Sequence, residues 1–72
     1  MRKRSITIGG HQTSIALEDP FWNELAALAE ARRLSLSALV AEIDKARGES
    51  GNLASALRLH VLKALRRKIS RA

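Results

Sequence analysis

Three side chains at alternate positions near the N-terminus have chemistry that suits the edges of nucleic-acid bases. They are Gln12, Ser14 and Ala16. A glutamine amide can bond to adenine through two hydrogen bonds, a serine hydroxyl can give or accept one, and an alanine methyl can touch the methyl of thymine. The same alternation occurs in strands whose outer face only meets water, so the pattern alone leaves both interpretations open.

The residues between these side chains predict the element that positions them. Thr13, Ile15 and Leu17 occupy the intervening places, so a strand would turn them toward a core and the polar set outward. One short strand leaves backbone donors and acceptors unpaired on both edges. The simplest partner is the same strand of a second copy of the chain, and an antiparallel two-stranded ribbon fits the DNA major groove.

The segment before this strand has two interpretations. Residues 5–8 alternate between polar and apolar side chains, and Gly9-Gly10 is a turn signal. Two alternating runs joined by two glycines favour a hairpin, whereas a flexible arm is the alternative. Residues 1–11 are therefore predicted to form either an extra strand or a basic N-terminal arm.

Two helices are predicted next, and with the strand they form a core unit of residues 12–48. Asp19-Pro20 indicates a helix start, with Asp19 as the cap, and the helix is expected to continue to about residue 33. Ser35 is the expected cap of the second helix, which ends near Arg47-Gly48 because glycine suits the position past a last turn.

A third, basic helix is predicted in residues 52–72. Asn52 is its expected cap, after a loop at residues 49–51, and the helix runs from Leu53 to about Ile69. Its apolar side chains share one face at helical spacing. That face consists of Leu53, Leu57, Val61, Ala64 and Leu65.

Apolar spacing also identifies a core that two copies of the chain are expected to share. Phe21, Leu28, Ala29 and Leu36 have the same periodicity on the first two helices. The predicted dimer core consists of Ile15, Leu17, Trp22, Leu25, Leu39, Val40 and Ile43.

Charge is segregated along the chain, whose formal net charge is +6. Both ends are basic and lack acidic residues, and all the acids lie between Glu18 and Glu49. Such segregation suits a surface that binds a polyanion, although a solvated basic surface is the alternative. The cations of the two ends are Arg2, Lys3 and Arg4, and Arg58, Lys63, Arg66, Arg67, Lys68 and Arg71.

The start of the second predicted helix is a further candidate for binding phosphate. The side chains of Ser35 and Ser37, with the free N–H groups of Leu36 and Ser37, make an anion site at a helix N-terminus. With Arg2, Lys3 and Arg4, these residues form the predicted set of DNA phosphate contacts. The alternative role of Ser35 is ordinary capping, which does not require a phosphate.

Other classes of function find little support in the residues. No carboxylate pair, Ser-His-Asp set or cysteine has a spacing that indicates catalysis, and His11 and His60 stand apart, so we expect neither an enzyme nor a metal or cofactor. The absence of cysteine fits a reducing cytosol, and no apolar run is long enough to span a membrane.

Two rival interpretations use residues 53–71. In one, this helix docks a protein partner, and in the other it lies on anionic lipid.

The order and spacing of these motifs resemble those of ribbon-helix-helix proteins over about residues 12–47. The wider pattern is similar to a bacterial subgroup of short members with an added third helix. The resemblance is carried by Lys3-Arg4-Ser5-Ile6-Thr7-Ile8, Gly10-His11, Thr13-Ser14-Ile15, Phe21-Trp22, Leu36-Ser37-Ala38-Leu39-Val40-Ala41-Glu42-Ile43-Asp44 and Asn52-Leu53-Ala54-Ser55-Ala56-Leu57-Arg58.

The resemblance implies a mainly α protein with a short β-ribbon. Two chains would intertwine as a homodimer with antiparallel strands between them, plus a third C-terminal helix, and the ribbon would enter the major groove. Gln12, Ser14 and Ala16 would read bases, and residues 35–37 would bind phosphate. The expected function is that of a sequence-specific transcription regulator, a repressor, in the bacterial cytoplasm at the nucleoid. The alternative is an antitoxin-like or adaptor dimer that binds protein and whose ribbon is masked by the N-terminal segment.

Overall fold

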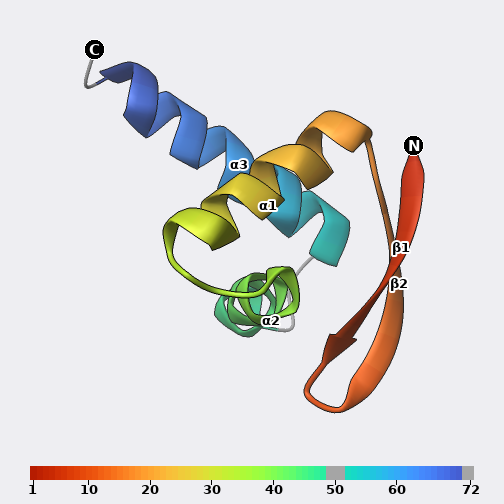
Figure 1. Ribbon diagram of the computed structural model, residues 1–72. Coiled ribbons are helices and arrows are strands. Elements are labelled where there is room, and N and C mark those ends of the chain that lie inside the picture. The colour runs from red at the N-terminus through yellow and green to blue at the C-terminus, as the bar shows by residue number, and fades with distance from the viewer. Residues whose placement is uncertain (49–51, 71–72) are drawn as a thin grey trace.

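The architecture is a two-stranded hairpin followed by three helices, as seen in a computed structural model that describes residues 1–48 and 52–70 (Figure 1). The predicted loop at residues 49–51 lies outside the described residues, as do residues 71–72. The elements are β1 (Arg2–Ile8), β2 (His11–Leu17), α1 (Asp19–Ala31), α2 (Leu36–Arg47) and α3 (Leu53–Ser70).

The N-terminal segment is a strand, which decides between the two interpretations of residues 1–11. β1 pairs antiparallel with β2, in a register that places Ser5 opposite Ser14 and Thr7 opposite Gln12. Gly9 and Gly10 connect the strands with φ angles of 56° and 84°. A two-residue turn with positive φ at both positions matches the right-handed twist of a hairpin, so the glycine pair sets the register.

The two strands of this ribbon belong to one chain. The sequence favoured pairing of β2 with the β2 of a second copy, whereas β1 occupies one edge of β2 here. The sequence also offered the hairpin of residues 5–8 with β2, but left a flexible basic arm as the alternative. Intertwining of two chains stays a prediction.

The first helix begins and ends differently from the prediction. Asp19 is its first residue, and the cap is Glu18, whose carbonyl accepts hydrogen bonds from Phe21 N (3.0 Å) and Trp22 N (3.2 Å). α1 ends at Ala31 rather than at residue 33. Arg33 adopts a left-handed φ of 57°, an arrangement that closes a helix end and usually selects glycine.

The caps predicted for the other two helices are confirmed. Ser35 Oγ accepts a hydrogen bond from Ala38 N at 3.0 Å, and Gly48 ends α2 with a φ of 66°. Asn52 Oδ1 accepts hydrogen bonds from Ala54 N (2.8 Å) and Ser55 N (3.3 Å) at the start of α3. Capping residues satisfy N–H groups that have no acceptor inside the helix.

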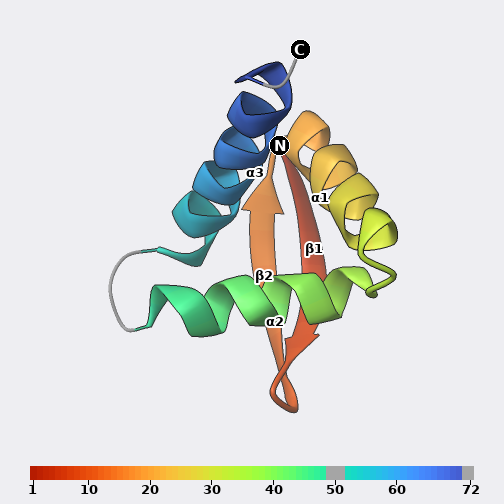
Figure 2. The ribbon, with the colours of Figure 1, turned by 90° about the vertical axis from the view of Figure 1, so that its left-hand side faces the viewer.

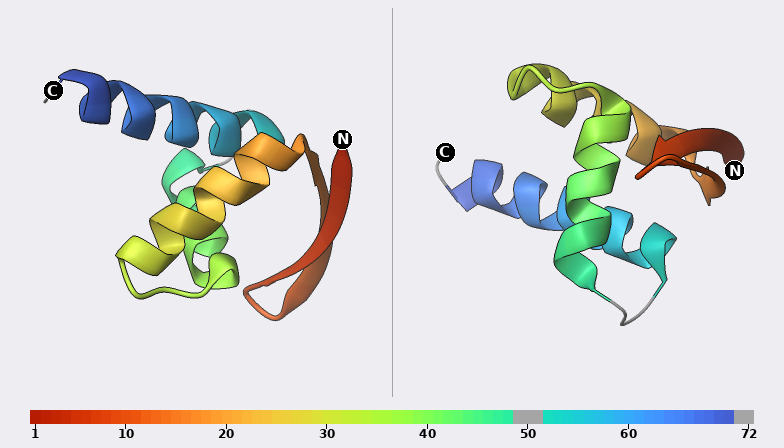
Figure 3. Two further views of the ribbon diagram at one scale, coloured as in Figure 1. Left: turned by 45° about the horizontal axis from the view of Figure 1, so that its top comes forward. Right: turned by 90° about the horizontal axis from the view of Figure 1, so that it is seen from below.

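All three helices lie on one side of the hairpin (Figures 1 and 3). α2 crosses the two strands, with α1 and α3 above it (Figure 2). The buried core between the hairpin and the helices consists of Ile6, Ile15, Leu17, Trp22, Leu25, Ala29, Leu39, Val40, Ile43, Leu57 and Val61.

One chain buries the whole set that the sequence assigned to a core shared by two chains. Phe21 and Leu28, expected on the same face of α1, are half-buried against it. Of the apolar face predicted for α3, Leu57 and Val61 are buried, whereas Leu65 is 38% exposed. The sharing of this core between two chains stays a prediction.

The burial of Leu57 predicts that α3 is needed for the stability of the fold. Leu57→Ala should lower the free energy of unfolding by about 2–5 kcal/mol, because it leaves a cavity in the core. Leu59→Ala is the matched control on the same helix, since Leu59 is 54% exposed. Urea denaturation followed by circular dichroism measures both, and equal losses would contradict a core role for Leu57.

Candidate nucleic-acid interface

The outer face of the hairpin gathers small polar side chains. Because side chains alternate along a strand and Ile6, Ile15 and Leu17 are buried against the helices, the residues between them point away. Gln12 and Ser14 are exposed and Ala16 is half-buried. The face comprises Lys3, Ser5 and Thr7 from β1, with Gln12, Ser14 and Ala16 from β2.

No helix of residues 1–48 or 52–70 covers this face, because α1, α2 and α3 all lie on the other side of the hairpin (Figure 1). β1 lies beside β2 rather than over it. The masking of the ribbon by the N-terminal segment, considered in one interpretation of the sequence, is therefore not observed. Ser5 and Thr7 were missed as candidate site residues. Their signal is the Gly9-Gly10 turn, which aligns Thr7 with Gln12 once a hairpin is assumed.

The three N-terminal cations do not share one face. Lys3 lies on the outer face, opposite Ala16. Arg2 Nε donates to Asp19 Oδ1 at 2.9 Å, and the Arg4 guanidinium lies over the Trp22 ring, 5.5 Å from its centroid. Arg2 and Arg4 are exposed but also hold β1 to α1, so their role as phosphate-binding residues stays a prediction. Lys3 points outward, where it can face a ligand.

The start of α2 does not lie on the outer face of the hairpin. It lies behind the hairpin, nearer to β1 than to β2 (Figure 2). Ser35 is exposed and its hydroxyl caps the helix, whereas Leu36 and Ser37 are half-buried. Backbone N–H groups in a first turn have no acceptor within the helix. They could therefore hydrogen-bond to a phosphate that passes along this side of the hairpin.

Two neighbouring carboxylates connect the hairpin, α1 and α3 where β2 ends. Glu18 accepts from Arg58 of α3, at 3.1 Å and 3.4 Å, and Asp19 accepts from Arg2 of β1. The pKa of Glu18 is lowered by a hydrogen bond from its own backbone N–H and then by the Arg58 side chain. The hydrogen bond from Arg2 lowers the pKa of Asp19. Arg58, counted among the basic residues of the C-terminal end, is thus partly neutralised within the fold.

A family model described as a ribbon-helix-helix domain matches residues 1–65. The chain belongs to the ribbon-helix-helix family. The family generally binds DNA, in transcription regulators and antitoxins, and its domains are regulatory rather than catalytic. No curated protein and no solved structure matches the chain.

Two kinds of feature are absent from the described residues, a membrane-spanning helix and a cluster of metal ligands. No helix in residues 1–48 or 52–70 is long and apolar enough to cross a membrane. Within the same residues, histidine and acidic side chains do not cluster in groups of three or more that could hold a metal ion.

The Glu18–Arg58 pair predicts a contribution to stability at neutral pH. Because folding lowers the pKa of Glu18 from its ordinary value of 4.5, the contribution is present above that value and is lost as pH falls through the lower pKa of the folded protein. Glu18→Gln should therefore lose less stability than the wild type when pH is lowered from about 7 to about 3. Urea denaturation at each pH measures this difference.

Arg58→Gln is the companion variant for that measurement. It keeps the hydrogen bond from the backbone of Glu18 and removes only the partner side chain. Its loss of stability over the same pH interval should lie between those of the wild type and Glu18→Gln. If the wild type and the two variants lose the same stability as the pH is lowered, the ionised Glu18 side chain does not stabilise the fold.

Proposed function

We propose that this protein binds double-stranded DNA with sequence specificity and regulates transcription, most simply as a repressor. The observation that carries the proposal is the uncovered polar face of the ribbon in a basic member of the ribbon-helix-helix family. The ribbon enters the major groove, where Gln12 and Ser14 hydrogen-bond to base edges and Ala16 meets a thymine methyl.

Phosphate contacts supply most of the affinity in this proposal, because they are the larger electrostatic term in DNA binding. Lys3 faces the same side as the base-reading residues, and Arg2 and Arg4 lie on the same strand. The first turn of α2, at residues 35–37, lies on the β1 side and receives a phosphate through backbone N–H groups.

The active form in this proposal is a homodimer in the bacterial cytoplasm, at the nucleoid. Ribbon-helix-helix proteins typically dimerise, and a two-fold symmetric protein matches a two-fold symmetric DNA site. A cofactor or an enzymatic step has no part in the proposal.

Selection from a random duplex library, followed by salt titration, tests this function. We expect an enriched motif with two-fold symmetry. The slope of log K against log salt should be about −2 if only Lys3 of each chain neutralises a phosphate, and steeper by about 0.9 for each further phosphate that Arg2 or Arg4 neutralises. Light scattering of the complex gives the number of chains per site. A slope near zero, or no enrichment, would refute the proposal.

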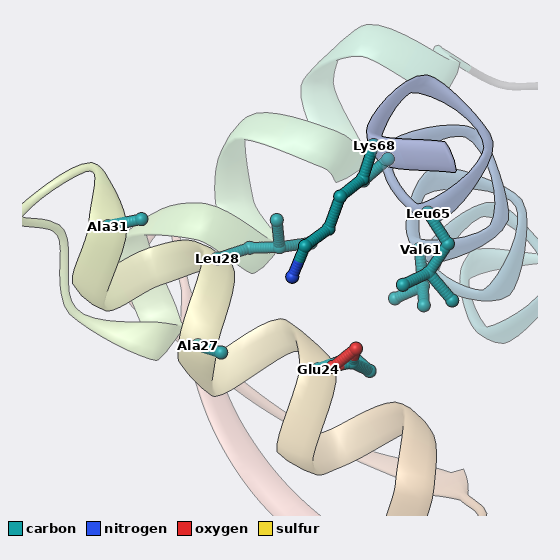
Figure 4. Close-up of a pocket in the computed structure, with 8 residues that line it drawn as sticks. Glu24, Ala27, Leu28, Ala31, Val61, Leu65 and Lys68 are labelled. Carbon is teal, nitrogen blue, oxygen red and sulfur yellow. The ribbon is translucent and has the colours of Figure 1, made fainter. Parts of the chain in front are cut away.

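A second candidate function is the binding of a protein partner through α3, as an antitoxin or adaptor does. The observation that favours it is a group of exposed leucines on this helix. Leu59 is 54%, Leu62 48% and Leu65 38% exposed, among cations of the same helix. Of these leucines, Leu65 lines a largely apolar groove between α1 and α3. Figure 4 shows this groove, with Glu24, Ala27, Leu28 and Ala31 on the α1 side and Val61, Leu65 and Lys68 on the α3 side.

A pull-down from nuclease-treated bacterial extract tests the second candidate. If α3 docks a protein, a stoichiometric partner survives nuclease with the wild type and is lost with the double substitution Leu59→Ser and Leu62→Ser. Both side chains are exposed, so the fold should persist, which circular dichroism checks. Gln12→Ala is the control on the ribbon and should keep the partner. Capture that is lost on nuclease treatment would favour DNA binding alone.

A further inference from the structure

Four exposed cations gather near the C-terminal end of α3, a helix whose sequence contains no acidic residue. In residues 1–48 and 52–70, none of the four has a carboxylate partner. Cations in a last turn suit the helix dipole, but only two of the four belong to that turn. We call this group the C-terminal cation cluster, and it consists of Lys63, Arg66, Arg67 and Lys68.

The C-terminal cation cluster lies at the end of the molecule opposite to the hairpin. The first half of α3 is held within the fold, where Leu57 is buried and Arg58 pairs with Glu18 at the end of β2. The second half extends away from the strands, so that the hairpin and the end of α3 occupy the two extremes of the molecule (Figures 1 and 3). The structure therefore separates the cations of the two chain ends.

A duplex that lies against the outer face of the hairpin does not reach this cluster. That face points away from the helices, so α1, α2 and α3 stand between such a duplex and residues 63–68. Duplex DNA is also stiff over short lengths, because its persistence length is about 150 base pairs. A site of ordinary length does not turn round the molecule to meet its other end.

The chemistry of the cluster fits closely spaced phosphates. Residues three and four apart are neighbours on a helix, so Lys63, Arg66 and Arg67 repel one another. A partner with dense negative charge relieves this repulsion, and duplex DNA carries one phosphate for about every 1.7 Å of its axis. Two other partners fit less well. α3 contains no Trp, Tyr or Phe to anchor it in lipid, and lysine is depleted in protein interfaces.

We propose that the C-terminal cation cluster binds the phosphate backbone of a second DNA segment, so that the protein bridges two duplexes. The proposal rests on the proposed binding of a first duplex by the hairpin. The second segment is bound without sequence preference, because phosphate contacts carry no base information. It belongs either to another DNA molecule or to a distant part of the same one.

The test measures whether protein held on one duplex retains another. A duplex with the selected motif is fixed to beads and saturated with the full chain, and unbound protein is washed away. A fluorescent duplex that lacks the motif is then titrated onto the beads. We expect it to be retained in proportion to the bound protein. If the four cations of one α3 each neutralise one phosphate, its binding constant should fall about 100-fold between about 50 and about 200 mM salt.

The double variant Arg66→Gln with Arg67→Gln removes two of these contacts. Both residues lie outside the two grooves in which Lys68 and Lys63 accompany the acidic residues Glu24 and Glu42, so nearby acids do not offset their charge there. The variant should bind the second duplex more weakly, and its binding constant should fall only about tenfold over the same salt interval. Its motif and its affinity for the first duplex should not change. Circular dichroism checks that α3 is still formed.

Two further double variants serve as controls. Arg33→Gln with Lys45→Gln removes the same charge from exposed positions outside α3, and Leu59→Ser with Leu62→Ser removes exposed apolar side chains from α3 itself. Both should retain the second duplex as the wild type does. If the charge control loses as much as the Arg66 and Arg67 variant, the effect follows net charge rather than the cluster, and the proposal is wrong.

The outcomes separate this proposal from the function on which it rests. If the protein selects no motif, the proposed function fails and bridging fails with it. If the first duplex is bound with its motif and the second is not retained, the function stands and bridging is refuted. Equal weakening of the first duplex by the Arg66 and Arg67 variant would place α3 on that duplex, which also overturns the proposal. So would sedimentation with phosphatidylserine vesicles, lost on Leu59→Ser with Leu62→Ser, in a protein that retains no second duplex.

Discussion

Burial of one face of the β1–β2 hairpin against three helices is the constraint on which the rest of the structure depends. A strand can present only every second side chain to a core. Once Ile6, Ile15 and Leu17 are buried, their neighbours must face outward, and none of the helices follows them to that side. The polar face of the ribbon is thus a direct consequence of how the core is formed.

Trp22 is the residue that connects β1 to the helices. Its indole is buried, its N–H donates to the carbonyl of Arg2, and its ring lies beneath the Arg4 guanidinium. One side chain on α1 therefore fixes the first half of β1 through a hydrogen bond, apolar packing and a cation–π contact. The conformation of a short N-terminal strand that starts at residue 2 is stabilised from within the molecule.

The electrostatic role of the basic residues is divided between the fold and the surface. Arg2 and Arg58 each pair with a carboxylate at the start of α1, and Arg58 also lies over the Phe21 ring. Such partly exposed pairs are individually weak, but here they join β1 and α3 to the same point of the chain. A count of cations consequently overestimates the charge that is free to meet a ligand, and Lys3 is the N-terminal cation that faces the same way as Gln12 and Ser14.

The sequence by itself determined β2, the three helices, most of the caps and the division of β2 into a buried and an outer side, because these follow from periods of two and about 3.6 residues and from local capping chemistry. It also determined the family, through motifs that span the hairpin and all three helices. Only the tertiary structure decided that β1 is the partner of β2, since the choice between two edges depends on contacts far apart in sequence, above all Trp22 with Arg2. The same contacts decided that Arg2 and Arg4 hold the fold together, and that Ser5 and Thr7 join the candidate site, which no local pattern encodes.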